Sequence, residues 1–337
     1  MTQMHRTWIF ENQPVIVGSS AVGGPFEGNG NLAEDFDILH DDLWLGEDSY
    51  EKAHKVLLEE SIFKSIEKAN LAKEDIQFLL AGDLINQITP SSFAARTFAT
   101  PYLGLFGACS TSMEGLALGA FIVNHGGANY VVTAASSHNS AVEKQFRYPT
   151  EYGGQKPPTA QWTVTGSGAC VLGSEGKGPK VTSATIGKVI DMGLSDPFNM
   201  GGAMAPAAVD TIEAHLKERK VDPSYYDLII TGDLGKIGHE VALDLMTKHE
   251  IGISPEQFKD CGMLIYRDGQ PVLAGASGPG CSATVLYGHL LNRMRKGELK
   301  RILVVATGAL LSPLTFQQNE SIPCIAHAVS IEYGGDN

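Results

Sequence analysis

Residues 76–87 have the sequence IQFLLAGDLINQ, and residues 226–238 have the sequence YDLIITGDLGKIG. Each is an apolar run that contains Gly-Asp-Leu, and each follows a segment with the apolar period of a helix, residues 49–75 and 208–224. Apolar runs of this length that alternate with helices are typical of parallel strands buried on both faces of a sheet. The pair therefore predicts two α/β units of similar design.

The parallel between the two units continues along the chain. GACSTSMEGLALGAFIV (107–123) precedes YVVTAASSH (130–138), and GPGCSATVLYGHLL (278–291) precedes ILVVATGALLS (302–312). Cys109 lies 22 residues before Val131, and Cys281 lies 23 before Val304. The shared order and spacing indicate a gene duplication and a pseudosymmetric α/β fold, although chance recurrence of such short strings stays open. The Gly-rich break GSEGKGPK (173–180) predicts halves at 1–178 and 179–337.

Composition and charge exclude several classes of function. The 337 residues include 25 Lys and Arg against 38 Asp and Glu, a formal net charge of −13. Such a charge argues against nucleic-acid partners and against electrostatic docking on an anionic membrane, so an anionic ligand would need a local basic pocket. The N-terminus has no signal-peptide pattern, and the most apolar stretch (103–123) carries a Glu and several hydroxyls that suit a buried core helix. We therefore expect a soluble protein.

The five cysteines are scattered and show no metal-binding spacing. This pattern favours reduced thiols in a cytosolic compartment and makes a structural zinc site improbable. We expect no metal site and no cofactor.

Cys109, in FGACSTSMEG (106–115), stands where an apolar helix is expected to begin. The positive end of a helix dipole favours a thiolate, and backbone N–H groups there can form an oxyanion hole. The alternative is a small buried residue, because free Cys is among the most buried residue types. For Cys170, Cys261 and Cys281 the buried interpretation is preferred.

A duplicated α/β chain with a Cys at the start of a buried helix resembles the thiolase superfamily of thiolases and ketoacyl synthases. It resembles the stage V sporulation protein AD family more closely still, nearly from end to end. The stretches that carry this resemblance are LAGDLINQ (80–87), FGACSTSMEG, residues 136–169 from SSHNSAVEKQFRYPTEYGG to TVTGSGA, GGAMAPAA (201–208), VVATGALLSP (304–313) and ESIPCIAH (320–327).

The resemblance implies a thiolase-like fold, two pseudosymmetric halves in a layered αβαβα arrangement, and a homodimer. It implies a protein that binds dipicolinic acid, free or as the calcium chelate, without catalysis, and that supports its transport into the developing spore and its release at germination. Membrane-embedded proteins of the same transport assembly would be its partners, and it would be peripheral at the spore inner membrane. Two alternatives stay open: an acyltransferase or condensing enzyme that uses Cys109 as nucleophile, and a structural partner of a spore membrane channel.

The catalytic partners of such a nucleophile are missing from the sequence. Where ketoacyl synthases have a His after a second-half strand, Gly232 or Asp233 stands here, and near the place of their Asn stands Gly280. Cys324 matches the second Cys of thiolases, and His327 replaces a glycine of their last turn. A nucleophile without groups that handle protons should lose several powers of ten in rate. We therefore expect no catalytic residues, with Cys109 at the ancestral nucleophile position.

A site for dipicolinate, a flat pyridine with two carboxylates, needs cationic or amide donors and an apolar wall. Residues 136–158 follow a strand whose carboxyl end is where α/β folds bind ligands. For each side chain there, a structural role such as pairing with Glu143 or Glu151 stays an alternative. The predicted ligand-binding residues are Cys109, His138, Asn139, Arg147, Tyr148, Tyr152, Lys156, Cys324 and His327.

Other polar features are interpreted as structural. The acidic stretch EDFDILHDDLWLGED (34–48) lacks the spacing of an EF-hand loop, so we interpret it as a solvated face. The Gly-rich stretches 24–31 and 275–282 lack the P-loop lysine and a full dinucleotide fingerprint, and we interpret both as turns. Asp83 and Asp233, in the two Gly-Asp-Leu turns, are expected to cap the helices that follow them.

Overall fold

A computed structural model describes residues 5–147 and 155–335 of the chain as an α/β fold. Its strands are β1 (Thr7–Ile9), β2 (Val15–Gly23), β3 (Ile38–Leu39), β4 (Phe78–Gly82), β5 (Tyr102–Leu105), β6 (Tyr130–Ser137), β7 (Trp162–Thr163), β8 (Gly166–Gly173), β9 (Lys180–Thr185), β10 (Leu228–Thr231), β11 (Phe258–Asp260), β12 (Ala276–Ser277), β13 (Arg301–Ala309) and β14 (Cys324–Glu332).

The helices alternate with these strands along most of the chain. They are α1 (Pro25–Gly28), α2 (Tyr50–Lys68), α3 (Thr89–Phe98), α4 (Thr111–Asn124), α5 (Asn139–Phe146), α6 (Met200–Arg219), α7 (Gly235–Lys248), α8 (Pro279–Thr284), α9 (Leu291–Arg295) and α10 (Pro313–Gln317). A 3-10 turn, η4 (Ala108–Ser110), precedes α4, and a π-helical segment, η8 (Val285–Leu290), joins α8 to α9. The predicted strands that lead into the two Gly-Asp-Leu turns are confirmed as β4 and β10.

The strand order has the same pattern in the two parts of the chain. The N-terminal strands run β2-β8-β6-β4-β5, and the C-terminal strands run β9-β14-β13-β10-β11. In each series the first two pairings are antiparallel and the last two are parallel. A single residue pair, Val15 with Lys180, joins the two series through β2 and β9. The pseudosymmetric α/β fold is confirmed, while the boundary at 178/179 stays a prediction.

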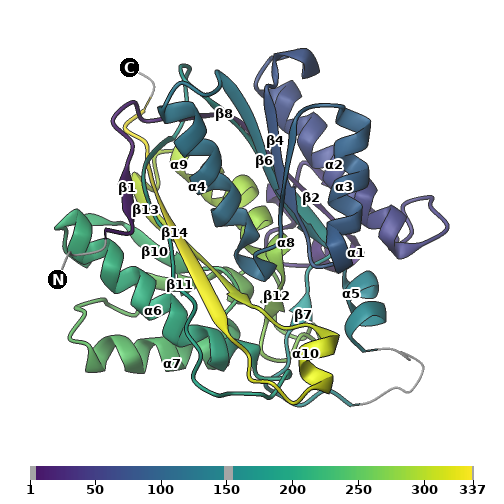
Figure 1. The fold of residues 1–337 in the computed structure, drawn as a ribbon, viewed down its shortest axis with the longest axis vertical. Helices are drawn as coiled ribbons and strands as arrows, with labels where there is room; N and C mark the ends of the chain where they lie inside the picture. The colour runs from purple at the N-terminus through teal and green to yellow at the C-terminus, as the bar shows by residue number, and fades with distance from the viewer. Residues whose placement is uncertain (1–4, 148–154, 336–337) are drawn as a thin grey trace.

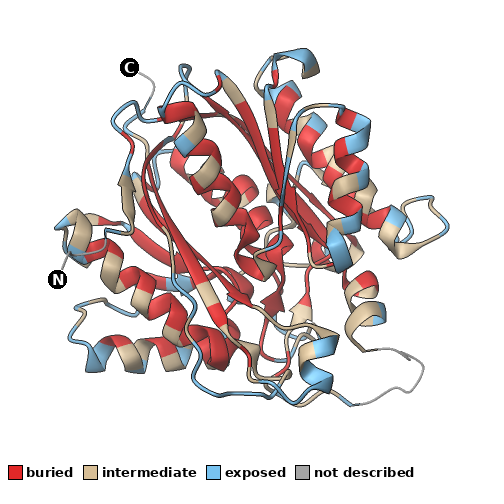
Figure 2. Cartoon of the chain, in the orientation of Figure 1, coloured by how far each residue is buried: buried red, intermediate tan, exposed pale blue. Residues whose placement is uncertain are grey.

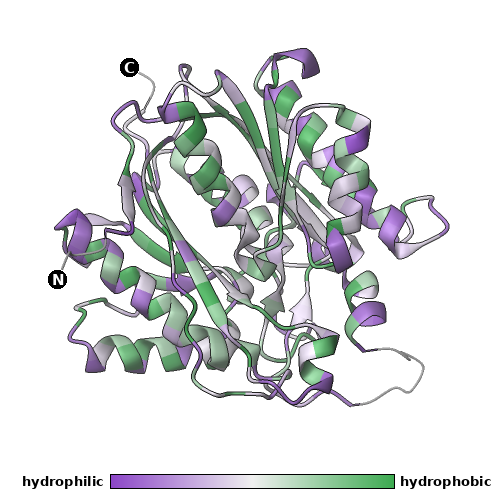
Figure 3. Ribbon diagram, viewed as in Figure 1, coloured by the Kyte–Doolittle hydropathy of each residue, from purple (hydrophilic) through white to green (hydrophobic). Residues whose placement is uncertain are grey.

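The two series of strands alternate with three layers of helices, two on the outside and one between the series (Figure 1). Helices α2 and α3 pack with β4, β6 and β8 in one apolar cluster, and α6 and α7 pack with β10, β13 and β14 in another. Helices α4 and α8 lie between the two series of strands, in the largest cluster, which includes residues of both halves. Figure 2 shows the resulting burial of strands and central helices, and Figure 3 shows hydrophilic residues gathered on outer helix faces and loops.

The apolar stretch 103–123 divides between β5, η4 and α4, and α4 is a core helix as predicted. Over the part of the chain that the structure describes, no helix combines the length and the apolar character that crossing a bilayer requires. Gly82, at the end of β4, permits this packing, because a Cβ there would collide with the carbonyl oxygen of Leu105 on β5. The turn into η4 also places Ala108 at a φ of +51°, in the left-handed region.

Candidate functional site

Cys109 lies in the middle layer, in the turn η4 just before α4, and is only 6% exposed. Three groups from the C-terminal part of the chain reach its thiol: the carboxyl of Asp233, the hydroxyl of Ser277 and the N–H of Gly278. The thiol therefore faces the other half of the fold rather than solvent.

Asp233 is the centre of this cluster and is fully buried. Its Oδ2 atom accepts hydrogen bonds from the Ser277 hydroxyl at 3.1 Å and the Gly278 N–H at 2.9 Å. Its Oδ1 atom accepts one from the Thr307 hydroxyl at 2.8 Å, and its main-chain oxygen accepts one from the Gln161 amide at 2.8 Å. The predicted cap role of Asp233 is wrong, because its side chain bonds strand ends and the start of α8 instead of the helix that follows it.

A different carboxylate, Asp260, caps that helix. Its oxygens accept from the N–H groups of Leu234 and Gly235 at 2.8 and 3.0 Å, at the start of α7. Asp83 does have the predicted role, since it accepts from the N–H groups of Ile85 and Ser91 where α3 begins. Only the first Gly-Asp-Leu turn thus uses its Asp as a local cap.

Burial decides the electrostatics around Cys109. Loss of solvation raises the pKa of the Cys109 thiol well above its usual range, and the neighbouring Asp233 carboxyl raises it further. Burial likewise raises the pKa of Asp233, against the donors that bind it. Burial and the Asp233 carboxyl thus favour the protonated thiol, against the effect expected of the helix dipole.

A second cluster forms where α5 ends and β7 approaches. Arg147 Nη1 lies 3.0 Å from Glu143 Oε2, and Lys156 Nζ lies 2.7 Å from Glu143 Oε1. All three side chains are 21 to 26% exposed, so the group is open to solvent without being fully hydrated. Two cationic side chains thus meet at one carboxylate on a protein of net charge −13.

Two aromatic faces border these cations. The guanidinium of Arg147 lies 5.3 Å from the ring centre of Phe198, and Lys156 Nζ lies 5.4 Å from that of Trp162. Trp162 in turn stacks on Phe26 at 4.5 Å. Cationic donors beside flat apolar faces are the elements that an aromatic carboxylate requires.

His138 and Asn139 lie at the start of α5, where both are buried. His138 Nε2 donates a hydrogen bond to the carbonyl oxygen of Leu43 at 2.9 Å, and burial lowers the pKa of His138 to about 4. The Asn139 amide donates to the carbonyl oxygen of Thr163 at 3.3 Å. Both side chains fix this helix against neighbouring segments.

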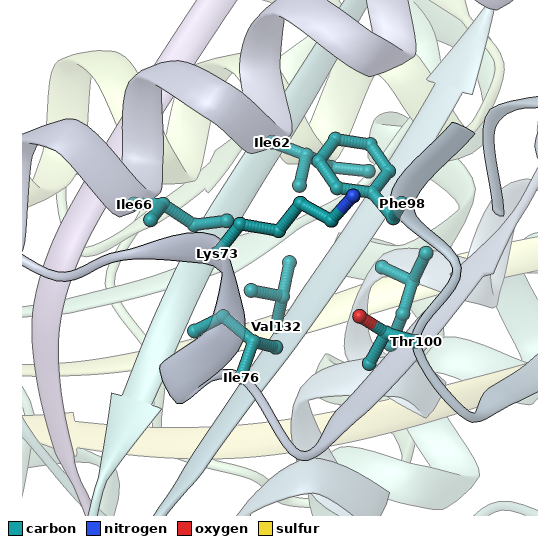
Figure 4. Close-up of a pocket in the computed structure, with 8 residues that line it drawn as sticks. Ile62, Ile66, Lys73, Ile76, Phe98, Thr100 and Val132 are labelled. Carbon is teal, nitrogen blue, oxygen red and sulfur yellow. The ribbon is translucent and has the colours of Figure 1, made fainter.

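The cavity in Figure 4 lies apart from both clusters, and its lining includes residues of α2 and β6. It encloses about 10 Å³, room for a single water molecule, and its lining includes Ile62, Ile66, Phe98 and Val132. Nor do residues 5–147 and 155–335 contain a group of three or more His, Cys, Asp or Glu that would hold a metal ion.

Comparison with known protein families shows which family the chain belongs to. The model of the family described as stage V sporulation protein AD (SpoVAD) matches residues 4–332. The chain belongs to the SpoVAD family. A relative from Bacillus subtilis (strain 168), stage V sporulation protein AD, is 47% identical over 330 residues, which cover 98% of this chain and 97% of the relative. The family assignment from sequence is confirmed.

Solved structures of condensing enzymes share the SpoVAD fold. The 3-oxoacyl-[acyl-carrier-protein] synthase III of Aquifex aeolicus VF5 is 12% identical with a TM-score of 0.57, over 95% of this chain and 100% of that one. Cerulenin-bound OleA of Xanthomonas campestris is 14% identical with a TM-score of 0.63, over 97% and 100% of the two chains. At such identities the likeness shows the fold, and it confirms the thiolase-like architecture.

The structure brings together some of the residues proposed from sequence for this SpoVAD family member. Arg147 joins Lys156 at Glu143, but Tyr148 and Tyr152 lie outside the described residues. Cys324 and His327 are three residues apart on β14, so their side chains point to opposite faces. His327 Nδ1 accepts from the N–H of Gly187 at 3.3 Å, whereas Cys324 packs in the cluster with α6.

Several residues of the two clusters were missed by sequence reasoning. Ser277 and Gly278 reach the thiol, whereas the N–H of Gly280, which stands near the place of the ketoacyl synthase Asn, donates to Ser137. Trp162 and Phe198 border the cationic cluster and were not named, whereas the pairing of Arg147 and Lys156 with Glu143 is the structural alternative left open from the sequence. Asp233 also had a signal, because the resemblance put Gly232 or Asp233 where ketoacyl synthases have their His.

Proposed function

We propose that this chain binds dipicolinate, free or as its calcium chelate, and supports dipicolinate transport into the developing spore and its release at germination. Membership of a sporulation family supports the biological setting. The observation that carries the chemistry is the convergence of Arg147 and Lys156 on Glu143 beside two aromatic rings. A dianion would take carboxylate contacts from the two cations, in competition with Glu143, and lay its ring on Trp162 or Phe198.

Calorimetric titration with dipicolinic acid, with and without calcium, tests this site. Arg147→Ala and Lys156→Ala should each weaken binding about tenfold or more, because each removes a charge-assisted hydrogen bond. Glu143→Gln should strengthen binding, since it removes the competing carboxylate. The matched control is Lys144→Ala, on the same helix, whose ammonium pairs with Glu51 instead.

The direction of the Glu143→Gln effect separates ligand binding from a purely structural role. A structural ion cluster would lose stability in all three variants and would not gain affinity in any. Unchanged binding in all variants would move the site elsewhere, and no binding by the unmodified protein would overturn the proposed function.

We also propose that the chain is a degenerate thiolase-like protein rather than an enzyme. The raised pKa of the buried Cys109 thiol supports this proposal, as does the presence of Gly232 or Asp233 where ketoacyl synthases have a His. A buried carboxyl whose oxygens already accept from three fixed donors is poorly placed to shuttle a proton to or from a substrate. The acyltransferase alternative requires acylation at Cys109, which the Discussion tests.

A homodimer is proposed through the free edge of β5. This strand ends the sheet, and Leu103 and Phe106 beside its edge are 47% and 57% exposed. Next to Gly107, the Oε2 atom of Glu114 is buried without a hydrogen-bond partner. A second copy paired on β5 would cover the apolar side chains and could supply the missing donor.

Light scattering after gel filtration tests the dimer. The unmodified protein should have twice the mass of one chain, and Leu103→Glu with Phe106→Glu should yield monomers, because two charges would be buried without partners. Ile9→Glu, at a residue 53% exposed on β1, is the matched control and should stay dimeric. A dimer that survives the double change would place the interface elsewhere.

A further inference from the structure

Glu27 is a carboxyl group buried between the two halves of the fold. It lies on α1, in the N-terminal half, and its residue is 0% exposed. Its Oε1 atom accepts hydrogen bonds from the N–H of Thr165 at 3.0 Å and from the hydroxyl of Tyr266, in the C-terminal half, at 2.5 Å. Gly24, just before α1, donates in turn to the carbonyl oxygen of Thr165 at 2.8 Å. One side chain thus joins three segments that are far apart in the sequence.

The second oxygen of this carboxyl has no hydrogen bond. Among the described residues none donates to Oε2, although this atom is shielded from solvent. A neutral carboxyl fits this arrangement, because its carbonyl oxygen can accept both bonds and only an uncharged O–H is left unpaired. An ionised carboxylate fits poorly, because a charged oxygen without a donor in the core carries a larger desolvation cost. Burial accordingly raises the pKa of Glu27 to about 7, although the Tyr266 hydroxyl and the Thr165 N–H lower it.

Phe26, the neighbour of Glu27 on α1, packs behind the proposed dianion site. Its ring stacks on that of Trp162 at 4.5 Å and meets the ring of Tyr266 edge-on at 5.5 Å. Lys156 Nζ lies 5.4 Å from the centre of the same Trp162 ring. Figure 1 shows α1 near β7, the strand that carries Trp162. A change in how Glu27 holds α1 therefore reaches the ring beside Lys156, and a negative charge on Glu27 would oppose a dianion there.

The other titratable groups near α1 are distinguishable from Glu27. Burial raises the pKa of Tyr266, and of Cys281 near it, well above the ordinary values, so both are neutral at pH 7. His40, which follows β3, lies 2.6 Å from Glu60, and this contact raises the pKa of His40, which makes it a necessary control. The remaining charged groups of the adjoining segments are Asp35, paired with His289, Asp37, paired with Lys68, and the exposed Glu34, Arg267 and Asp268.

We propose that Glu27 is a proton-dependent positioning residue: as a neutral carboxyl it holds Phe26 against Trp162, and it takes up a proton when a dianion binds beside that ring. The inference rests on the proposed function and deepens it, because it makes dianion affinity depend on pH. The direction follows from linkage. If ionised Glu27 weakens dianion binding, a bound dianion must favour protonated Glu27 to the same extent. Affinity should therefore fall as the pH rises through 7.

Calorimetric titration with dipicolinic acid from pH 6 to pH 8 measures this coupling. Binding to the unmodified protein should weaken about threefold or more over that range, with a proton uptake that appears as a heat dependent on the buffer. Glu27→Gln keeps an acceptor oxygen and stays neutral, so its affinity should be independent of pH and its binding should take up no proton. Tyr266→Phe removes a donor that lowers the pKa of Glu27, so the fall in affinity should move to higher pH. Glu34→Gln, at an exposed carboxyl, is the matched control and should behave like the unmodified protein.

Urea unfolding of the ligand-free protein tests the same group without dipicolinate. The pKa of Glu27 is about 7 in the fold against an ordinary value of 4.5, so its contribution to stability is complete below pH 4.5 and is lost as the pH rises through 7. The unmodified protein should therefore lose stability relative to Glu27→Gln between pH 5 and pH 8. Asp83 and Asp260, with pKa values raised to about 6 and about 7, contribute equally to both proteins and cancel.

The two measurements separate the ways in which the inference can fail. A fall in affinity that persists in Glu27→Gln would overturn the inference, and a fall that disappears in His40→Gln would assign the effect to His40. Equal pH dependence of stability in the unmodified protein and Glu27→Gln would show that the fold does not hold the proton. Binding independent of pH in the unmodified protein would refute the coupling and leave the proposed function intact. No dipicolinate binding at any pH would overturn the proposed function and the coupling together.

Discussion

Asp233→Ala is expected to destabilise the protein by about 3 kcal/mol or more, because three donors would lose their acceptor inside the core. The hydroxyls of Ser277 and Thr307 and the N–H of Gly278 all bond the Asp233 carboxyl. These groups belong to β12, β13 and the start of α8, so the loss weakens the packing of these C-terminal elements around Asp233, next to Cys109. Urea unfolding measures the change in the free energy of unfolding.

Two controls give this result its meaning. Asp233→Asn keeps an oxygen that can accept, and it should cost less than the alanine change. Asp244→Ala removes an exposed carboxylate from α7 and should change stability by no more than about 0.5 kcal/mol. An Asp233→Ala protein as stable as the Asp244→Ala control would show that the bonds to the Asp233 carboxyl do not stabilise the fold.

In the native protein, Cys109 should react with iodoacetamide about 100-fold or more slowly than in the urea-unfolded chain. The thiolate is the reactive form, and burial together with the Asp233 carboxyl raises the pKa of this thiol well above the usual range. Because the pKa of the thiol is raised, the rate of labelling should keep increasing as the pH rises past 9, the ordinary pKa of a Cys thiol. Mass spectrometry of the peptide that contains Cys109 measures the extent of labelling over time.

The same assay decides between a degenerate protein and an enzyme. Incubation with an acyl-thioester should leave Cys109 unmodified in the native protein. Labelling as fast as in urea, or an acyl group on Cys109, would contradict the proposal and support the acyltransferase alternative. Asp233→Asn is informative here, since removal of the neighbouring negative charge should increase the labelling rate if the fold is retained.

Much of the fold could be predicted because its signals are local. The apolar runs that lead into the Gly-Asp-Leu turns are β4 and β10, and the small-residue stretch after Cys109 is the core helix α4. Their repeated order also indicated the duplication. The site was harder to predict, because residues that are neighbours in the fold are far apart in the sequence. Cys109 and Asp233 meet only because α4 and α8 are enclosed between the two sheets.

The sequence by itself determined the α/β class, the family, and the absence of the expected catalytic His from its place. It also indicated the segment that supplies Arg147 and Lys156, since residue types and spacing are local properties. Only the tertiary structure decided that Asp233 bonds across strand ends while Asp260 caps α7, and that the Cys109 thiol is buried beside the Asp233 carboxyl. Hydrogen bonding and desolvation depend on which groups are packed together in the core, and that packing is a property of the whole chain.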